Sequence, residues 1–169
     1  MLAQWSWSRD AIIAGEWWRL ITGHLVHVDL WHLLMNATGT LALWWLFHKD
    51  LSIRQLIAAV LGAVLMVNGG LWYLGSLQVY AGLSGVLHGV AAAGIWVLIR
   101  ARDRWGWLLA AAGVAKLLIE NILAPSMLDA FHRIATEAHL LGAVGGLLAA
   151  ALLSLFRTAA SKQTRSGDG

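Results

Sequence analysis

A serine and a histidine stand out because each is a reactive side chain set in an apolar, glycine-containing segment. Ser84 lies in the sequence Tyr-Ala-Gly-Leu-Ser-Gly-Val-Leu-His-Gly, and His139 lies in the sequence Glu-Ala-His-Leu-Leu-Gly. A serine hydroxyl becomes a good nucleophile when a neighbouring base takes its proton, and a neutral imidazole suits that task near pH 7. The two residues therefore predict acyl-transfer chemistry, provided that the fold brings them together.

A second polar pair, His32 and Asn36, has the chemistry to stabilise a developing oxyanion. Their spacing of four residues places both on one face of a helix, and imidazole and amide N–H groups can donate hydrogen bonds to an oxyanion. Each motif alone has a simpler explanation, because glycine and serine favour close helix contacts and polar side chains join helices. We favour the catalytic interpretation because all three motifs fall near the same end of their predicted helices.

The elements that would position these residues are membrane-spanning helices. Of the 169 residues, 59% are hydrophobic and only 12% are charged, whereas a soluble domain is about half apolar and a quarter charged. Runs of about 20 apolar residues can cross a bilayer. We therefore predict an all-α integral membrane protein with spans at residues 28–47, 53–74, 83–99, 105–123 and 136–156. These would form one transmembrane domain, residues 1–156, followed by a disordered polar tail, residues 157–169.

The basic residues indicate an orientation in the membrane. Eight of the 12 lysines and arginines follow the first, third and fifth predicted spans, and the positive-inside rule places such clusters in the cytoplasm. The C-terminus would then be cytoplasmic, while Ser84 and His139 would lie near the outer face. This distribution accounts for the net charge of +3 without a nucleic-acid partner. The chain has no cysteine, which excludes disulfides and thiolate catalysis.

Glycine spacing predicts that the two helices carrying Ser84 and His139 pack closely. One Gly-x-x-x-Gly pair begins at Gly85 in the third predicted span, and another begins at Gly142 in the fifth. Small residues at such spacing let helix backbones approach each other in a membrane. A hydrogen bond of about 2.6–3.2 Å between the hydroxyl and the imidazole needs that approach.

These motifs, in this order, resemble the rhomboid intramembrane serine proteases over about residues 16–148. The matching positions are the Glu-x-Trp-Arg motif with Trp18 and Arg19, the His-x-x-x-Asn motif with His32 and Asn36, the Gly-x-Ser-Gly motif with Gly82, Ser84 and Gly85, and the last motif with His139 and Gly142. By this resemblance, Ser84 would attack a peptide carbonyl of a membrane protein substrate, and His139 would act as base and then as acid. His32, Asn36 and the Ser84 backbone N–H would form the oxyanion hole. The resemblance implies no metal, no cofactor and no third, acidic member.

The chain departs from the family pattern in two respects. The family fold has six core helices, and this chain shows five, so we expect a further span before Met1. Many rhomboids have a tyrosine four residues after the serine, where it stacks on the catalytic histidine, and this chain has His88 there. An imidazole could also stack, or could form a hydrogen bond.

The segment Gly-Leu-Ser-Gly-Val-Leu-His-Gly resembles the bacterial rhombosortase branch of the family. That resemblance implies an enzyme of the inner membrane, with its active site open to the periplasm. Its substrates would be proteins that carry a C-terminal Gly-Gly sorting signal followed by a hydrophobic anchor.

Three competing interpretations remain open. His24, His27 and His32 cluster in the first loop and could bind a metal, but a His-Glu-x-x-His motif is absent. A catalytically inactive rhomboid-like protein could bind or deliver membrane clients. Finally, Lys116 and Glu120 could line the path of a transporter, although an ion pair within one helix explains their spacing more simply.

Overall fold

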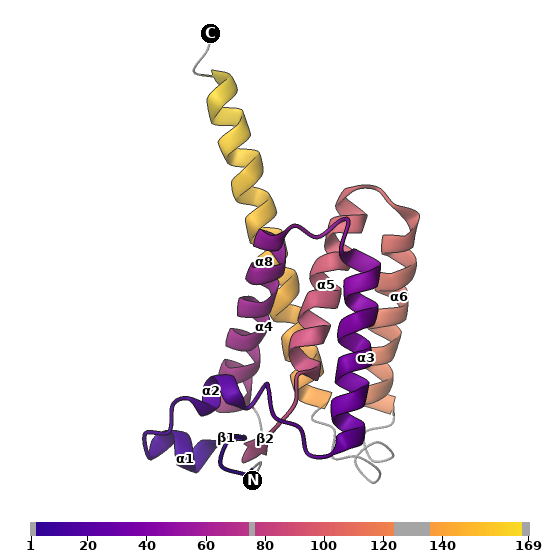
Figure 1. Cartoon of the computed structure of the whole chain (residues 1–169). Coiled ribbons are helices and arrows are strands. Elements are labelled where there is room, and N and C mark those ends of the chain that lie inside the picture. Colours follow the sequence, from indigo (N-terminus) through magenta and orange to yellow (C-terminus); the bar gives the residue numbers. More distant parts are fainter. Residues whose placement is uncertain (1–2, 75–76, 124–135, 167–169) are drawn as a thin grey trace.

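The computed structural model describes residues 3–74, 77–123 and 136–166. Figure 1 shows a helical bundle with a small paired-strand region at one end. The helices are α1 (Arg9–Ile13), α2 (Arg19–Thr22), α3 (Leu30–Phe47), α4 (Ile53–Tyr73), α5 (Ser84–Arg100), α6 (Arg104–Leu118), the π-helix η1 (Ile119–Leu123) and α8 (Thr136–Ser166), and the strands are β1 (Trp7–Ser8) and β2 (Val79–Tyr80).

The helices confirm the prediction of a helical membrane fold. Three of the described segments, Ile53–Tyr73, Arg104–Ile122 and Thr136–Phe156, are long and apolar enough to cross a bilayer. The apolar helix α5 is slightly shorter, with 17 residues, and α3 has 18 residues. All five predicted spans therefore coincide with helices, and three of those meet the length and hydropathy expected of a span.

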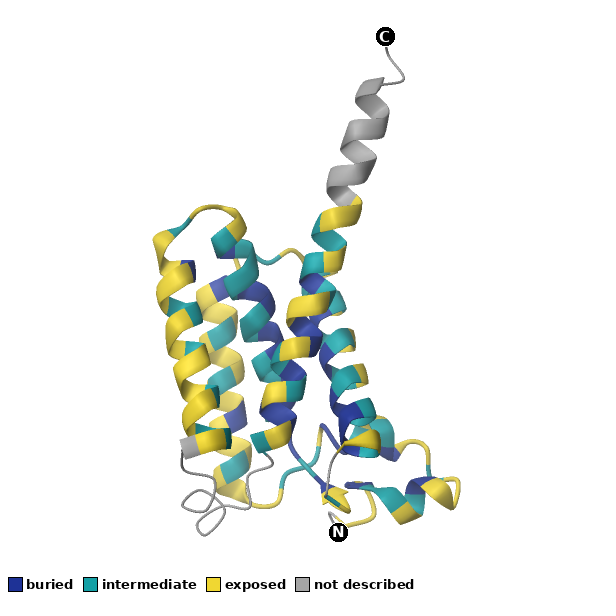
Figure 2. Ribbon diagram, turned by 180° about the vertical axis from the view of Figure 1, so that it is seen from behind, coloured by how far each residue is buried: buried dark blue, intermediate teal, exposed yellow. Residues whose placement is uncertain are grey.

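Helices α4, α5 and α8 pack most tightly, because glycines remove the side chains between them. A Cβ atom added to Gly142 in α8 would overlap the carbonyl of Gly85 in α5. A Cβ atom added to Gly62 in α4 would lie only 2.5 Å from the carbonyl oxygen of Gly145 in α8. Figure 2 shows the resulting concentration of buried residues on these three helices. The close approach predicted from the glycine spacing is present.

The N-terminal region is tied to the loop that precedes α5. Strand β1 pairs antiparallel with β2, with Trp7 opposite Tyr80. The buried Arg19 guanidinium lies 2.6 Å from the Glu16 carboxylate and donates to the Ser6 carbonyl at 2.8 Å. Arg19 of the Glu-x-Trp-Arg motif therefore holds this loop together, while Trp18 is half exposed.

Helix α8 continues beyond the last predicted span as far as Ser166, where the sequence predicted a disordered tail (Figure 1). Residues 157–166 contain neither glycine nor proline, and several are strong helix formers such as alanine, arginine, lysine and glutamine. Polarity alone therefore does not end this helix.

Candidate active site

Ser84 and His139 form a hydrogen bond across two helices. Ser84 is the first residue of α5, and His139 lies in the first turn of α8. Both helices begin at the same end of the bundle (Figure 1), and the Ser84 Oγ lies 2.9 Å from the His139 Nε2. His139 is 5% exposed, so its ring is held in place by the surrounding protein. The structure thus brings together the two residues that the sequence singled out.

The backbone before Ser84 is held in a conformation that requires glycine. Gly82 has φ = +136°, and an added Cβ would lie 2.7 Å from the His32 ring. The Gly82 N–H donates to the Gly23 carbonyl at 3.0 Å, and the Tyr80 hydroxyl donates to the Gly82 carbonyl at 2.5 Å. Burial raises the pKa of Tyr80, which keeps its hydroxyl protonated as a donor. These contacts fix the turn that leads into α5 and its N-terminal serine.

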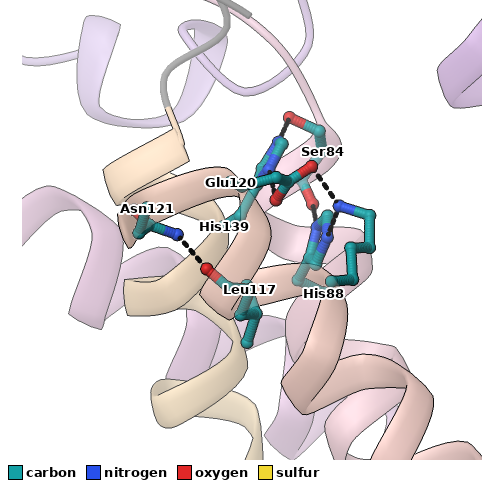
Figure 3. A network of polar contacts seen from close by, with 7 residues as sticks. Ser84, His88, Leu117, Glu120, Asn121 and His139 are labelled. Atoms are coloured by element: carbon teal, nitrogen blue, oxygen red, sulfur yellow. Dashed lines mark hydrogen bonds and ion pairs between the residues drawn. The ribbon is translucent and has the colours of Figure 1, made fainter. Parts of the chain in front are cut away.

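Glu120 is a member of this site that the sequence interpretation did not include. Its carboxylate oxygen Oε2 lies 3.0 Å from the His139 Nδ1, on the side of the ring away from Ser84 (Figure 3). The expectation of no third, acidic member therefore does not describe the geometry. The signal in the sequence was the charge itself, because an acidic residue inside a span is costly and needs a polar partner.

A π-helical turn carries Glu120 to this position. Helix α6 changes at Ile119 into η1, and π-helical turns inside α-helices occur frequently at functional sites. The Asn121 side chain donates to the Leu117 carbonyl at 3.0 Å, which satisfies an acceptor within this irregular turn (Figure 3). The wider turn could not be predicted from a period of 3.6 residues.

His88 packs against the base of the Ser84–His139 pair. The His88 and His139 rings are stacked, with centroids 4.1 Å apart and planes 15° from parallel. The His88 Nδ1 lies 2.7 Å from the Ser84 carbonyl oxygen, and its Nε2 lies 2.9 Å from the Lys116 Nζ. His88 therefore both stacks and forms hydrogen bonds, the two possibilities that its position had suggested.

These side chains line a cavity of about 440 Å³ between α3, α5, α6 and α8. His32 and Asn36 of the predicted oxyanion hole line the same cavity. The Asn36 amide donates one N–H to the His32 carbonyl at 3.0 Å, and an amide carries two such N–H groups. The other lining residues are Met35, Gly39, Ala42, Leu43, Ser84, Leu87, His88, Ala91, Lys116, Glu120 and His139.

The remaining predicted residues support the site rather than line it. Neither Trp18 nor Arg19 is among the described residues that line the cavity. Gly85 and Gly142 bring α5 and α8 together, because an added Cβ on either would meet backbone of the other helix. In the first loop, burial lowers the pKa of His24 to about 4, so this ring is neutral and packs edge-on against Tyr80.

Among the described residues, the three histidines of the first loop do not form a group with the spacing of metal ligands. Within the described part of the chain, the ligand atoms that lie within 4.8 Å of one another belong to His88, Glu120 and His139. The lone pairs of two stacked rings lie in nearly parallel planes, so the two imidazoles cannot both point at one ion without turning. The arrangement suits proton transfer along hydrogen bonds better than metal coordination.

Comparison with known proteins places this chain in a family. The Rhomboid domain family model matches residues 14–156. The chain is 28% identical over 137 residues to "Putative rhomboid protease YdcA" of Bacillus subtilis (strain 168), a match that covers 79% of this chain and 66% of that protein. It is also 28% identical over 151 residues to "Rhomboid protease GluP" of the same organism, which covers 85% of this chain and 27% of that protein.

Each match spans less than two thirds of the relative's own length. No solved structure matches the chain. The family model nevertheless covers most of the 169 residues, including every residue of the cavity described above. The chain is therefore an integral membrane protein that belongs to the Rhomboid domain family.

Proposed function

We propose that this chain is an intramembrane serine endopeptidase in which Ser84 is the nucleophile and His139 is the general base. The observation that carries this proposal is the 2.9 Å hydrogen bond between the Ser84 Oγ and the His139 Nε2. That bond lies in a cavity within a chain of the Rhomboid domain family. The printed names of two relatives, both called rhomboid proteases, support the same activity.

The reaction follows from the proton that this hydrogen bond shares. The Ser84 oxygen attacks the carbonyl carbon of a peptide bond while His139 Nε2 accepts the hydroxyl proton, which gives a tetrahedral oxyanion. The C–N bond then breaks, and His139 returns the proton to the leaving amine, leaving an acyl-enzyme. Water attacks the ester with His139 again as base, which releases the acid and restores the Ser84 hydroxyl.

Three groups are suited to stabilise the oxyanion. Ser84 begins α5, so its backbone N–H belongs to the first helical turn, where N–H groups have no partner within the helix. The helix dipole there also favours negative charge. Asn36 and His32 line the same cavity and carry side-chain N–H groups. We assign these three groups to the oxyanion hole.

The substrate would be a membrane protein cleaved in or next to its transmembrane segment. The basic loops favour an active site that opens to the outer side of a bacterial inner membrane, with the C-terminus in the cytoplasm. The short string from Gly82 to Gly89 favours the rhombosortase branch, and hence substrates with a C-terminal Gly-Gly signal and a hydrophobic anchor.

Co-expression with a reporter tests this proposal. The reporter carries a Gly-Gly signal, a hydrophobic helix and a basic tail, and its release from the membrane is followed by immunoblot. The wild-type chain should release the reporter, the Ser84→Ala variant should not, and Ser154→Ala should behave as wild type. Ser154 is a suitable control because it lies in α8, 15 residues beyond His139, where it accepts a hydrogen bond from Trp96.

The possible results distinguish the sorting substrate, the role of Ser84 and the protease activity itself. Cleavage of other single-span substrates, but not of the Gly-Gly reporter, would keep the protease and reject the sorting substrate. Release by Ser84→Ala at the wild-type rate would reject Ser84 as the nucleophile. If neither kind of substrate is cleaved but membrane proteins co-purify with both variants, the client-binding alternative replaces the protease.

A further inference from the structure

The carboxylate of Glu120 completes a row of three polar side chains. Ser84 Oγ contacts the His139 Nε2 at 2.9 Å, and Glu120 Oε2 contacts the His139 Nδ1 at 3.0 Å. Figure 3 shows the three residues in this order, from α5, α8 and η1. The Glu120 side chain is 13% exposed and that of His139 is 6% exposed. An interaction shielded from water in this way is stronger than the same pair at a surface.

The two contacts determine which ring nitrogen of His139 carries the proton. An ionised carboxylate can only accept a hydrogen bond, so His139 Nδ1 carries a hydrogen and donates it to Glu120. In the neutral ring the other nitrogen, Nε2, then presents its lone pair to the Ser84 hydroxyl. This is the tautomer that a general base needs, because only an unprotonated Nε2 can take the proton of the serine.

The second oxygen of Glu120 is held by a separate set of contacts. Lys116 Nζ lies 2.5 Å from Glu120 Oε1 and 2.9 Å from His88 Nε2. The ammonium can only donate, so His88 Nε2 accepts, and His88 Nδ1 donates to the Ser84 carbonyl. Each donor therefore meets an acceptor around a closed ring of five residues, in which the Ser84 backbone carbonyl accepts from His88. The carboxylate is fixed on both oxygens, which leaves it little freedom to turn away from His139.

We propose that Glu120 is a positioning residue of the active site, which fixes the tautomer of His139 and stabilises the imidazolium that forms when Ser84 attacks. The inference rests on the proposed protease function and adds a third member to its Ser84–His139 pair. During attack, the proton moves from Ser84 Oγ to His139 Nε2, and the Nδ1 hydrogen stays between His139 and Glu120. Glu120 itself gains no proton in this step.

The experiment compares the rates at which a fluorophosphonate probe labels Ser84; the serine oxygen attacks phosphorus, an O–P bond forms, and the P–F bond breaks with release of fluoride. The purified full chain is used in detergent, and the dependence of rate on probe concentration separates probe binding from the chemical step. Glu120→Gln should slow the chemical step about 10²–10⁴-fold with little change in probe binding. In serine proteases with a Ser-His-Asp triad, replacing the aspartate by its amide lowers kcat by up to about 10⁴-fold. The glutamine amide can donate to Nδ1, which favours the unreactive tautomer.

Three further variants make the test specific. Glu120→Asp should recover a large part of the rate, because a carboxylate is restored. Lys116→Met, which removes the ion pair but keeps the carboxylate, should slow labelling much less than Glu120→Gln. Glu137→Gln is the matched control, since Glu137 is an exposed glutamate of α8 two residues before His139, and it should label at the wild-type rate.

The outcomes distinguish this inference from the function on which it rests. A Glu120→Gln variant that labels as fast as wild type, or loses only thermal stability, would overturn the positioning role and leave the Ser84–His139 pair intact. Equal losses in Lys116→Met and Glu120→Gln, without recovery in Glu120→Asp, would assign the effect to the ion pair. A wild-type chain that takes no probe on Ser84 would instead remove the proposed function.

Discussion

The stacking of His88 on His139 can be separated from the hydrogen bonds of His88 by substitution. Its ring lies parallel to that of His139, with centroids 4.1 Å apart. An aromatic contact of this kind is worth about 0.5–1.5 kcal/mol, or about two- to tenfold in rate. His88→Ala should slow fluorophosphonate labelling of Ser84 by about that factor, whereas His88→Tyr should retain most of the rate. If the tyrosine variant is as slow as the alanine variant, the hydrogen bonds of His88 matter more than its stacking.

Asn36 provides the second prediction for a single residue. It is 4% exposed and lines the cavity beside Ser84. Removal of one oxyanion donor in serine proteases costs about 10²–10³-fold in kcat. Asn36→Ala should therefore lower kcat for reporter cleavage by about this factor and change KM little. An unchanged kcat in a folded variant would take Asn36 out of the oxyanion hole.

Residue types and spacing were enough to single out Ser84, His139, His32 and Asn36 as candidates, and the structure places all four around one cavity. Glu120 was missed for a physical reason. Its spacing from Lys116 matches an ion pair within one helix, and nothing in a linear sequence gives the rotation of α6 relative to α8. The contact with His139 depends on that rotation and on the π-helical turn of η1.

At the scale of elements, glycine contacts hold α5 against α8, and Gly142 offers a direct test of them. A Cβ at Gly142 would overlap the Gly85 carbonyl, whereas a Cβ at Gly113 in α6 meets no atom within 4 Å. Overpacking of this kind costs about 1–3 kcal/mol, while glycine to alanine in an open helix position gains about 0.5–1 kcal/mol.

Gly142→Ala should therefore lower the thermal unfolding midpoint in detergent, and Gly113→Ala should keep or raise it. The first variant should also lose activity, since the separation of α5 and α8 sets the distance between Ser84 and His139. Equal midpoints for the two variants would mean that the helices can separate at no cost, contrary to the packing described.

The five long helices could be predicted from hydropathy because each coincides with a mostly apolar stretch of the sequence. The short elements of the first loop could not. Strand β1 has only two residues, and it forms by pairing with β2, where Trp7 lies opposite Tyr80. A pairing between such distant parts of the chain leaves no local sequence pattern. Helix α8 extends to Ser166, beyond the span predicted at residues 136–156, where the sequence contains several strong helix formers.

At the scale of the whole molecule, the proposed orientation can be read by cysteine labelling, because the chain has no cysteine of its own. Ile13 in the first loop is 68% exposed, and Lys49 lies exposed between α3 and α4 at the other end of the bundle. A membrane-impermeant maleimide should label Ile13→Cys in spheroplasts, and Lys49→Cys only after lysis. The reverse pattern would place the active site on the cytoplasmic side.

The stability of the whole fold should depend on pH through His24. Burial lowers the pKa of this group from 6.5 to about 4, so the unfolded state binds a proton at higher pH than the folded state does. The contribution of a neutral His24 is thus present above about pH 6.5 and is lost as the pH falls toward 4. A His24→Leu variant should show a smaller fall of the unfolding midpoint between pH 7 and 5 than the wild type. Parallel falls in both proteins would assign the effect to other groups.

The serine that a fluorophosphonate modifies shows which hydroxyl of the chain is the nucleophile. After reaction of the purified chain, peptide mass spectrometry identifies the modified serine. We expect one adduct, on Ser84, in the wild-type protein and its near-complete loss in a folded His139→Ala variant. His139 Nε2 lies 2.9 Å from the Ser84 Oγ and is the base to which we assign the hydroxyl proton. An adduct on another serine, or equal modification of Ser84 without His139, would contradict this assignment.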